Sequence, residues 1–231
     1  MKWISDLLDI IFPRCCTVCG TTLSPGEKEL CLNCLMELPR TEPYTAGNDI
    51  EKQFYGIMAI ERAMSYMHYG KESPYNNIIH SLKYGDRPKV GKMIAATAAK
   101  ELLERGFFEG VEVIVPLPLS KKKKRQRGYN QCDFIAQGIS QVTGIAIDNT
   151  SVIRHIANDT QTHKRREERW KNVENIFSVK TSQALAGKHI LLIDDVLTTG
   201  ATLTSCGNAI LAAVPDCKLS IFTLARAGRS I

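Results

Sequence analysis

Two adjacent acids, Asp194 and Asp195, stand between an apolar run and a turn rich in hydroxyl groups. Residues 190–193 have the composition of a buried strand, and residues 198–202 (Thr-Thr-Gly-Ala-Thr) lead into an apolar segment with the composition of a helix. Backbone N–H groups at the start of such a helix bind an anion favourably, whereas the two carboxylates would accept hydrogen bonds from a diol or hold a cation. A ribose with free 2- and 3-hydroxyls and a 5-phosphate meets both requirements.

Four cysteines near the N-terminus offer a second chemistry. Cys16 and Cys19 form one C-x-x-C pair, and Cys31 and Cys34 form the other. Four thiolates make the closed tetrahedral shell of a structural zinc, with redox-active or merely buried cysteines as the alternative. Cys15 could replace Cys16 in a C-x-x-x-C arrangement, and the spacing favours Cys16.

A third candidate is a run in which six of the seven residues 121–127 are Lys or Arg. It follows an apolar run over 111–115 that ends in Pro116-Leu117-Pro118. A charge run is usually a solvated face, but open α/β sheets bind ligands where a buried strand ends. The run could therefore close over a pyrophosphate or contact a nucleic-acid backbone. Tyr129 beside it is the best placed aromatic for stacking on a base.

The elements that must position these residues alternate between helix and strand from about residue 75 onward. Helices are predicted over 73–83, 86–105, 130–142 and 202–214. Strands are predicted over 111–115, 145–147, 152–155, 177–179, 190–193 and 218–224, with a further strand or hairpin over 59–69. This alternation predicts an α/β fold with a largely parallel sheet covered on both faces. Residues 116–118 and 194–202 then fall at the carboxyl ends of strands, where function is expected.

Length and composition limit the domain organisation and the localisation of the protein. The 231 residues suffice for one α/β domain and a small module, which we place at 51–231 and 1–50, with a linker over 39–52. Residues 3–12 read as an amphipathic helix rather than a signal peptide, and no run reaches transmembrane length. We expect a cytoplasmic protein with reduced thiols and no membrane contact.

The charged segment 160–175 is either a surface helix or a loop ordered by ligand. Cys132, Cys206 and Cys217 are expected in the core.

Residues 190–203 resemble the phosphoribosyl pyrophosphate (PRPP) motif of type I phosphoribosyltransferases: an apolar strand, Asp-Asp, then Thr-Thr-Gly-x-Thr. With further motifs, nearly the whole chain is similar to the ComF family. The other motifs are the two Cys pairs, His80-Ser-Leu-Lys83-Tyr84, Val115-Pro-Leu-Pro118, Arg127-Gly-Tyr-Asn-Gln131 and Arg169-x-x-Asn172. The resemblance implies a type I phosphoribosyltransferase fold with a small zinc module, and a link to DNA uptake in natural competence.

The resemblance also implies roles for particular residues. Asp194 and Asp195 would be the catalytic acids that hold the ribose diol, Pro116 and Leu117 would lie at the pyrophosphate, and residues 121–130 would form a lid. Mg²⁺ would bridge the pyrophosphate and the diol. The 5-phosphate would be held by Thr198, Thr199, Gly200, Ala201 and Thr202. The remaining residues predicted to bind PRPP are Lys83 and Arg127, and for Lys83, which shares a helix face with His80, a solvated helix edge is the alternative.

Two classes of function remain open. One is an enzyme that transfers phosphoribosyl from PRPP to an unknown acceptor. The other is a non-catalytic PRPP or nucleotide sensor, or an accessory of the competence machinery that binds single-stranded DNA and competence helicase or recombination proteins, in an oligomeric state that the sequence does not define. An ATPase is excluded, because residues 85–93 lack the spacing and the hydroxyl of a P-loop. Glutamine-dependent amidophosphoribosyltransferases carry a separate glutaminase domain with an N-terminal Cys nucleophile. Residues 1–14 contain no Cys, so we do not expect glutamine as a nitrogen donor.

Overall fold

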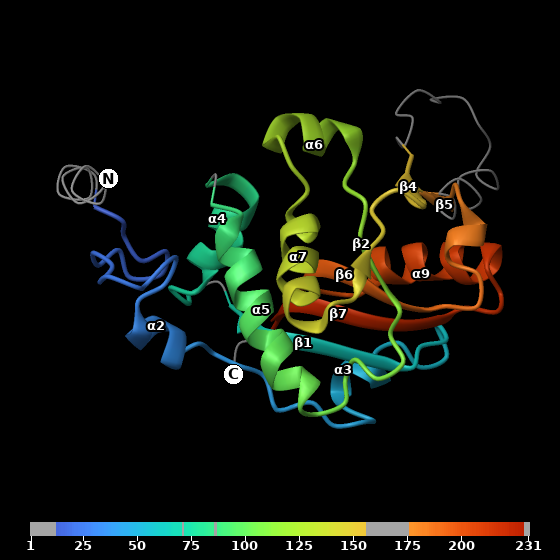
Figure 1. Ribbon diagram of the computed structural model, residues 1–231, viewed down its shortest axis with the longest axis horizontal. Coiled ribbons are helices and arrows are strands. Elements are labelled where there is room, and N and C mark those ends of the chain that lie inside the picture. Colours follow the sequence, from blue (N-terminus) through green and yellow to red (C-terminus); the bar gives the residue numbers. More distant parts are fainter. Residues whose placement is uncertain (1–12, 71, 86, 156–175, 229–231) are drawn as a thin grey trace.

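The protein is described here by a computed structural model that covers residues 13–70, 72–85, 87–155 and 176–228. The sequence predictions for 3–12 and 160–175 lie outside these residues. Within them, five parallel strands form the main sheet in the order β1-β7-β6-β2-β3 (Figure 1). In that order the strands are Arg62–Tyr69, Lys218–Ala227, His189–Leu197, Val113–Pro116 and Ala146–Ile147. The predicted parallel α/β architecture is confirmed.

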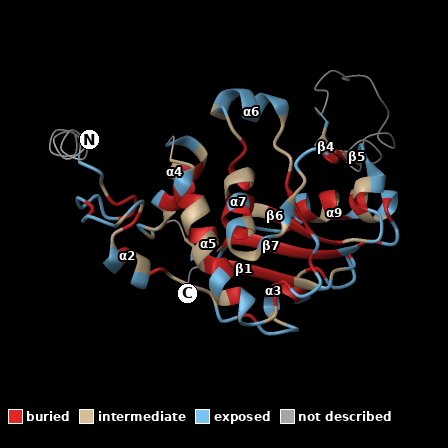
Figure 2. Ribbon diagram, in the orientation of Figure 1, coloured by how far each residue is buried: buried red, intermediate tan, exposed pale blue. Residues whose placement is uncertain are grey.

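Both faces of this sheet are buried, because side chains alternate along each strand. In β6, Leu191 and Ile193 join an apolar cluster with α4 (Asn76–Tyr84), α5 (Lys89–Leu103) and α7 (Gln131–Thr143). The intervening Ile190 and Leu192 join a second cluster with α9 and α3 on the opposite face. These two helices cover Ala201–Ala213 and Asp49–Lys52. The central strands are therefore buried on both sides (Figure 2), and β7 includes the buried polar residues Ser220 and Thr223.

Two local structures differ from the prediction. Strand β6 continues to Leu197 instead of ending at Ile193, because its pairing with β7 continues through Asp194 opposite Thr223. The two acids therefore lie inside the last part of the strand. The basic run forms helix α6 (Lys121–Arg127), which Ser120 caps by accepting a hydrogen bond from the backbone N–H of Lys123 at 3.3 Å. Every residue of α6 except Arg127 is exposed.

Residues 39–52, the predicted linker, form an ordered segment along the free edge of β1, which we call the edge cover. The backbone N–H of Thr41 donates to the carbonyl of Tyr66 at 3.0 Å. The buried carboxylate of Glu51 accepts a hydrogen bond from the N–H of Ala63 at 3.3 Å. Polar groups on the outer edge of the sheet are thus satisfied by this segment rather than left open.

The remaining elements flank the sheet. Strands β4 (Val152–Arg154) and β5 (Phe177–Val179) pair antiparallel beside α9, and a 3-10 turn, η1, covers Ser182–Ala184. The cysteine-rich segment with α2 (Leu32–Met36) packs on α4 and α5, where its apolar side chains belong to the same cluster as the helices. Among the described residues no helix combines the length and apolar character needed to cross a bilayer.

Candidate functional site

A pocket of ≈ 160 Å³ lies at the carboxyl ends of β2 and β6, next to α6. Side chains from six elements and from the loop after β2 converge on it, which is the placement expected for a site in an open α/β sheet. Its lining consists of Lys83, Leu117, Pro118, Leu119, Lys123, Arg127, Gln131, Cys132, Arg154, Asp194, Asp195 and Thr202.

An ion pair spans this pocket between α4 and β6. The Nζ atom of Lys83 lies 3.2 Å from Oδ2 of Asp195, and the side chain of Asp195 is only 6% exposed. Among the described residues, Oδ2 has no hydrogen-bond partner besides this ammonium. A carboxylate oxygen accepts more than one hydrogen bond, so a ligand hydroxyl or a cation could also be stabilised there.

Asp194 is the more strongly perturbed of the two acids. Burial raises its pKa to about 7, and the neighbouring Asp195 contributes in the same direction. Oδ1 of Asp194 accepts hydrogen bonds from the backbone N–H of Asp195 at 2.8 Å and from the thiol of Cys132 at 3.5 Å. Burial likewise raises the pKa of the Cys132 thiol, so this group remains a donor. The acid pair therefore binds a proton or a positive partner near neutral pH.

The rest of the pocket is strongly basic. Lys83, Lys123, Arg127 and Arg154 line it together with the two acids. Helix α9 begins beside the acids, and Gly200 at its N-cap, with φ of 77°, contributes no side-chain hydrogen bond to the first turn. The backbone N–H groups at this helix end, of which that of Ala201 donates to Oγ1 of Thr199, add positive potential to the four cations. The pocket can therefore hold an extended anion on one side and polar hydroxyls on the other.

Helix α6 is held over the pocket through Arg127. Its Nη1 donates to the side-chain oxygen of Gln131 at 2.8 Å, and its guanidinium lies 4.9 Å from the ring centroid of Tyr84. The hydroxyl of Tyr129 donates to the carbonyl of Leu82 at 2.9 Å. The C-terminal end of α6 is therefore tied to α4, the helix that carries the Lys83 ammonium. Tyr129 is half-buried in this contact rather than displayed for stacking.

The pocket gathers some of the residues predicted to bind PRPP but not all of them. Lys83, Leu117, Arg127, Asp194, Asp195 and Thr202 line it together. Pro116 is the last residue of β2 and is buried, while Thr198 and Thr199 are exposed in the turn that follows β6. Gly200 and Ala201 start α9 without lining the cavity. The turn therefore adjoins the pocket rather than forming its wall.

Arg154 is a pocket residue that the sequence analysis missed. It stands at the end of β4, and its guanidinium lies 5.2 Å from the ring centroid of Phe177 on β5. This contact holds the side chain in place over the hairpin. Nothing in the local sequence singles out this arginine, because its position depends on the pairing of β4 with β5.

The four cysteines of the two pairs come together as predicted. The sulfur atoms of Cys16, Cys19, Cys31 and Cys34 all lie within 4.8 Å of one another. Tetrahedral zinc with Zn–S bonds of about 2.3 Å sets its sulfurs about 3.8 Å apart, and the Cys19 and Cys31 sulfurs are 3.8 Å apart.

The thiol chemistry also fits a metal. Hydrogen bonding with Thr21 lowers the pKa of Cys19 to about 6, which favours the thiolate that binds metal, whereas burial raises the pKa of Cys34 in the metal-free cluster. Cys15 is outside the cluster, because its thiol donates to the carbonyl of Pro13 at 3.4 Å. Cys16 rather than Cys15 lies in the cluster, and the cluster could hold zinc.

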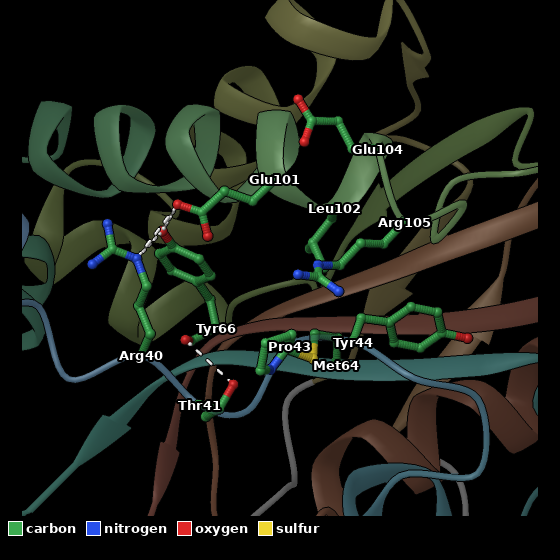
Figure 3. Close-up of a pocket in the computed structure, with 10 residues that line it drawn as sticks. All are labelled: Arg40, Thr41, Pro43, Tyr44, Met64, Tyr66, Glu101, Leu102, Glu104 and Arg105. Carbon is green, nitrogen blue, oxygen red and sulfur yellow. Dashed lines mark hydrogen bonds and ion pairs between the residues drawn. The ribbon is translucent and has the colours of Figure 1, made fainter.

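A second cavity, of ≈ 240 Å³, lies between the edge cover and the C-terminal end of α5 (Figure 3). Arg40 and Glu101 converge on the buried hydroxyl of Tyr66 there. The Nε of Arg40 donates to this hydroxyl at 3.0 Å, and the hydroxyl donates to Glu101 at 2.9 Å. These hydrogen bonds connect the edge cover to α5. None of the predicted site residues lines this cavity.

Comparison with known proteins identifies relatives over most of the chain. The DNA utilization protein YhgH of Salmonella typhimurium is 28% identical over 200 residues, or 85% of this chain and 83% of that protein. Competence protein F of Haemophilus influenzae is 26% identical over 225 residues, or 92% and 96%. Competence protein ComFC of Bacillus subtilis is 37% identical over 114 residues, which are 49% of this chain and 44% of that protein. No protein-family model matches the chain.

Solved structures align more loosely. The glutamine PRPP amidotransferase from B. subtilis complexed with ADP and GMP gives a TM-score of 0.39 at 19% identity, over 62% of this chain and 26% of that chain. Adenine phosphoribosyltransferase from Saccharomyces cerevisiae gives 0.33 at 17% identity, over 57% and 65%. Such alignments leave the fold to be judged from the strand order and the motif positions.

The sheet topology and the sulfur positions define an α/β protein with a five-stranded parallel sheet and an N-terminal cluster of four cysteines that could hold a metal. Over most of its length the chain is similar to YhgH and to competence protein F.

Proposed function

We propose that the pocket at Asp194 and Asp195 binds PRPP, and that the protein transfers the phosphoribosyl group to an acceptor. The single observation that carries this proposal is the meeting of two adjacent acids with four cationic side chains at the carboxyl ends of β2 and β6. A sugar bearing a diol, a phosphate and a pyrophosphate has groups complementary to each part of this pocket.

The acids suit the ribose. Oδ2 of Asp195 has only the Lys83 ammonium beside it among the described residues, and a ribose hydroxyl could donate to it as well. Asp194, with a pKa raised to about 7, sits where it could accept a proton from an incoming nucleophile at neutral pH. In this proposal, therefore, Asp195 orients the sugar and Asp194 holds the proton.

The basic side chains suit the pyrophosphate. Lys83, Lys123, Arg127 and Arg154 come from three different elements, α4, α6 and β4, so they can surround an anion from several directions. The N-terminus of α9, with Thr202 in its first turn, would take the 5-phosphate. Loss of pyrophosphate builds positive charge on the sugar that water would capture, and α6 is placed to exclude water from the pocket.

A divalent cation fits the same donor set. Two adjacent carboxylates, of the half-buried Asp194 and the buried Asp195, provide the hard oxygen ligands that Mg²⁺ prefers. Asp194 and Asp195 would hold Mg²⁺ at the sugar hydroxyls, where the ion would neutralise charge on the leaving pyrophosphate.

The proposal is tested by titrating PRPP into the zinc-loaded protein with Mg²⁺ present, by calorimetry and by thermal melting. Binding to the native state should raise the melting temperature, and the Asp194→Asn/Asp195→Asn variant should lose both the heat of binding and the shift. Asp216→Asn is the matched control, because this exposed acid lies in the turn after α9. Absence of PRPP binding to the wild-type protein would reject the site.

A sensor without turnover is the second candidate, favoured by relatives whose names refer to DNA utilization and competence rather than to a reaction. Pyrophosphate release separates the two. Release on addition of ammonia or a nucleobase identifies an enzyme and its acceptor class, whereas stable PRPP binding with no release across these acceptors identifies a sensor.

A further inference from the structure

The turn at residues 198–200, between β6 and α9, is held from outside by the segment that contains α3. In this turn Thr198 and Thr199 are exposed, and Gly200 has a positive φ of 77°. Among the described residues, the backbone N–H groups of Thr199 and Gly200 donate to no acceptor. Because donors that are already in position bind a ligand more tightly, the contacts that fix this turn bear on the proposed 5-phosphate site.

One contact comes from Gln53, the residue that follows α3. Its side-chain Nε2 donates a hydrogen bond to the backbone carbonyl of Thr198 at 3.1 Å. This bond joins positions that are 145 residues apart in the sequence. In a planar trans peptide the C=O and the following N–H point in opposite directions. A Thr198 carbonyl that is held toward Gln53 therefore directs the N–H of Thr199 away from α3.

A second contact comes from Phe54, which packs against the same turn. Its side chain is only 1% exposed, and it belongs to one apolar cluster with Leu197 and Leu203, the apolar residues on either side of the turn. A Cβ atom at Gly200 would lie 3.2 Å from the ring. The backbone of the turn therefore lies directly against the ring, which limits how far the turn can move inward.

The segment that supplies these contacts is itself anchored to the sheet. Asn48 caps α3 by accepting a hydrogen bond from the N–H of Ile50 at 2.8 Å, and its amide donates to the carbonyl of Ala63 at 3.0 Å. The carboxylate of Glu51 accepts a hydrogen bond from the N–H of the same Ala63. Strand β1 therefore fixes α3, and α3 in turn fixes the two residues that contact the turn.

We propose that Gln53 is a positioning residue for the 5-phosphate of the sugar, which acts by holding the Thr199 N–H in the direction that the phosphate requires. This inference rests on the proposed function, because it assigns Gln53 to the phosphate end of the same site. Gln53 does not line the pocket at Asp194, so it acts through the backbone of the turn. The cations proposed for the pyrophosphate lie on other elements, and the two ends of the ligand can therefore be tested separately.

Calorimetric titration of three probes into the whole zinc-loaded chain, with Mg²⁺ present, tests the proposal. PRPP carries both ends of the ligand, ribose 5-phosphate carries only the 5-phosphate end, and inorganic pyrophosphate only the other. The variant is Gln53→Met, which keeps the length of the side chain and removes its hydrogen-bond donor. The matched control is Gln141→Met, which makes the same change at an exposed position of α7 that does not line the pocket.

We expect Gln53→Met to weaken the binding of ribose 5-phosphate and of PRPP by about threefold to tenfold, the effect of losing one neutral hydrogen bond. Its affinity for pyrophosphate should be that of the wild type, because the turn lies at the other end of the site. Gln141→Met should match the wild type with all three probes. A merely structural role of Gln53 would instead lower the affinities for ribose 5-phosphate and pyrophosphate together.

Two results would overturn the assignment of Gln53 alone. One is an equal affinity of Gln53→Met and the wild type for ribose 5-phosphate, and the other is an equal loss of affinity for ribose 5-phosphate and pyrophosphate. In both cases the wild-type protein binds PRPP, and the proposed function stands. A wild-type protein that binds none of the three probes would reject the proposed function, and the role of Gln53 with it.

Discussion

The ammonium of Lys83 on α4 lies 3.2 Å from the carboxylate of Asp195 on β6, across the mouth of the proposed PRPP pocket. This ion pair joins two parts of the chain that are 112 residues apart (195 − 83). It places a positive and a negative group where a ligand must meet both. Helix α4 therefore contributes directly to the charge balance of the acids.

Replacing Lys83 with Met should destabilise the ligand-free protein. The Asp195 side chain is only 6% exposed, and a buried charge that loses its partner is costly. Because Lys83 itself is 24% exposed, water screens the pair, and we expect a loss of about 1–3 kcal/mol in the free energy of unfolding at pH 7. Urea denaturation measures it, with Lys124→Met on the exposed face of α6 as the control. Equal stability of the two variants would show that the pair is not coupled to folding.

Replacing Asp194 with Asn should stabilise the ligand-free protein at pH 8 while removing its affinity for PRPP. Burial raises the pKa of Asp194 from 3.8 to about 7. The folded state therefore holds a proton that the unfolded state has released, and wild-type stability falls as the pH rises between these two values. The advantage of the variant should be absent near pH 4, grow up to about pH 7 and stay constant above it. A difference in melting temperature that does not change with pH would contradict the raised pKa.

Cys34→Ser should lose the bound metal and stability together, whereas Cys15→Ser should retain one zinc per chain. Cys34 belongs to the cluster of four sulfurs, and Cys15 hydrogen-bonds to a backbone carbonyl outside it. Zinc analysis by mass spectrometry and thermal melting of both variants give the answer. Loss of zinc from Cys15→Ser would place Cys15 in the coordination shell.

Gly200→Ala should cost more stability than Gly128→Ala. Both glycines have positive φ, 77° and 80°, so each Ala pays a similar backbone penalty of about 1 kcal/mol. A Cβ at Gly200 would lie 3.2 Å from the Phe54 ring, whereas a Cβ at Gly128 meets nothing within 4 Å. The excess loss, measured by urea denaturation, reports the packing of the turn before α9. Equal losses of stability in the two variants would show that the Phe54 ring moves aside without a measurable cost.

Much of the fold follows from local sequence. The apolar periodicity of α5 and the continuous apolar run of β6 are strong signals, and both elements form where expected. Their ends are less predictable. Whether β6 stops at Ile193 or continues to Leu197 depends on its partner β7, and the charged run became helix α6 because Ser120 and Gly128 cap it.

For the same reason, the sequence predicts some residues of the site and misses others. Asp194 and Asp195 are adjacent in sequence and were identified together. Arg154 reaches the pocket through the pairing of β4 with β5, and the contact of Lys83 with Asp195 requires α4 to dock on the sheet. Tertiary packing creates both relationships, and no local pattern encodes them.

The edge cover protects the protein against pairing between β1 strands of two chains. Residues 39–52 follow directly from the cysteine module, and they occupy the outer hydrogen-bonding positions of β1. An uncovered strand at that position is a template for pairing with another chain. A chain that failed to acquire its metal would loosen the module that anchors this segment at one end. Loss of metal would then favour self-association of the protein through the uncovered edge of β1.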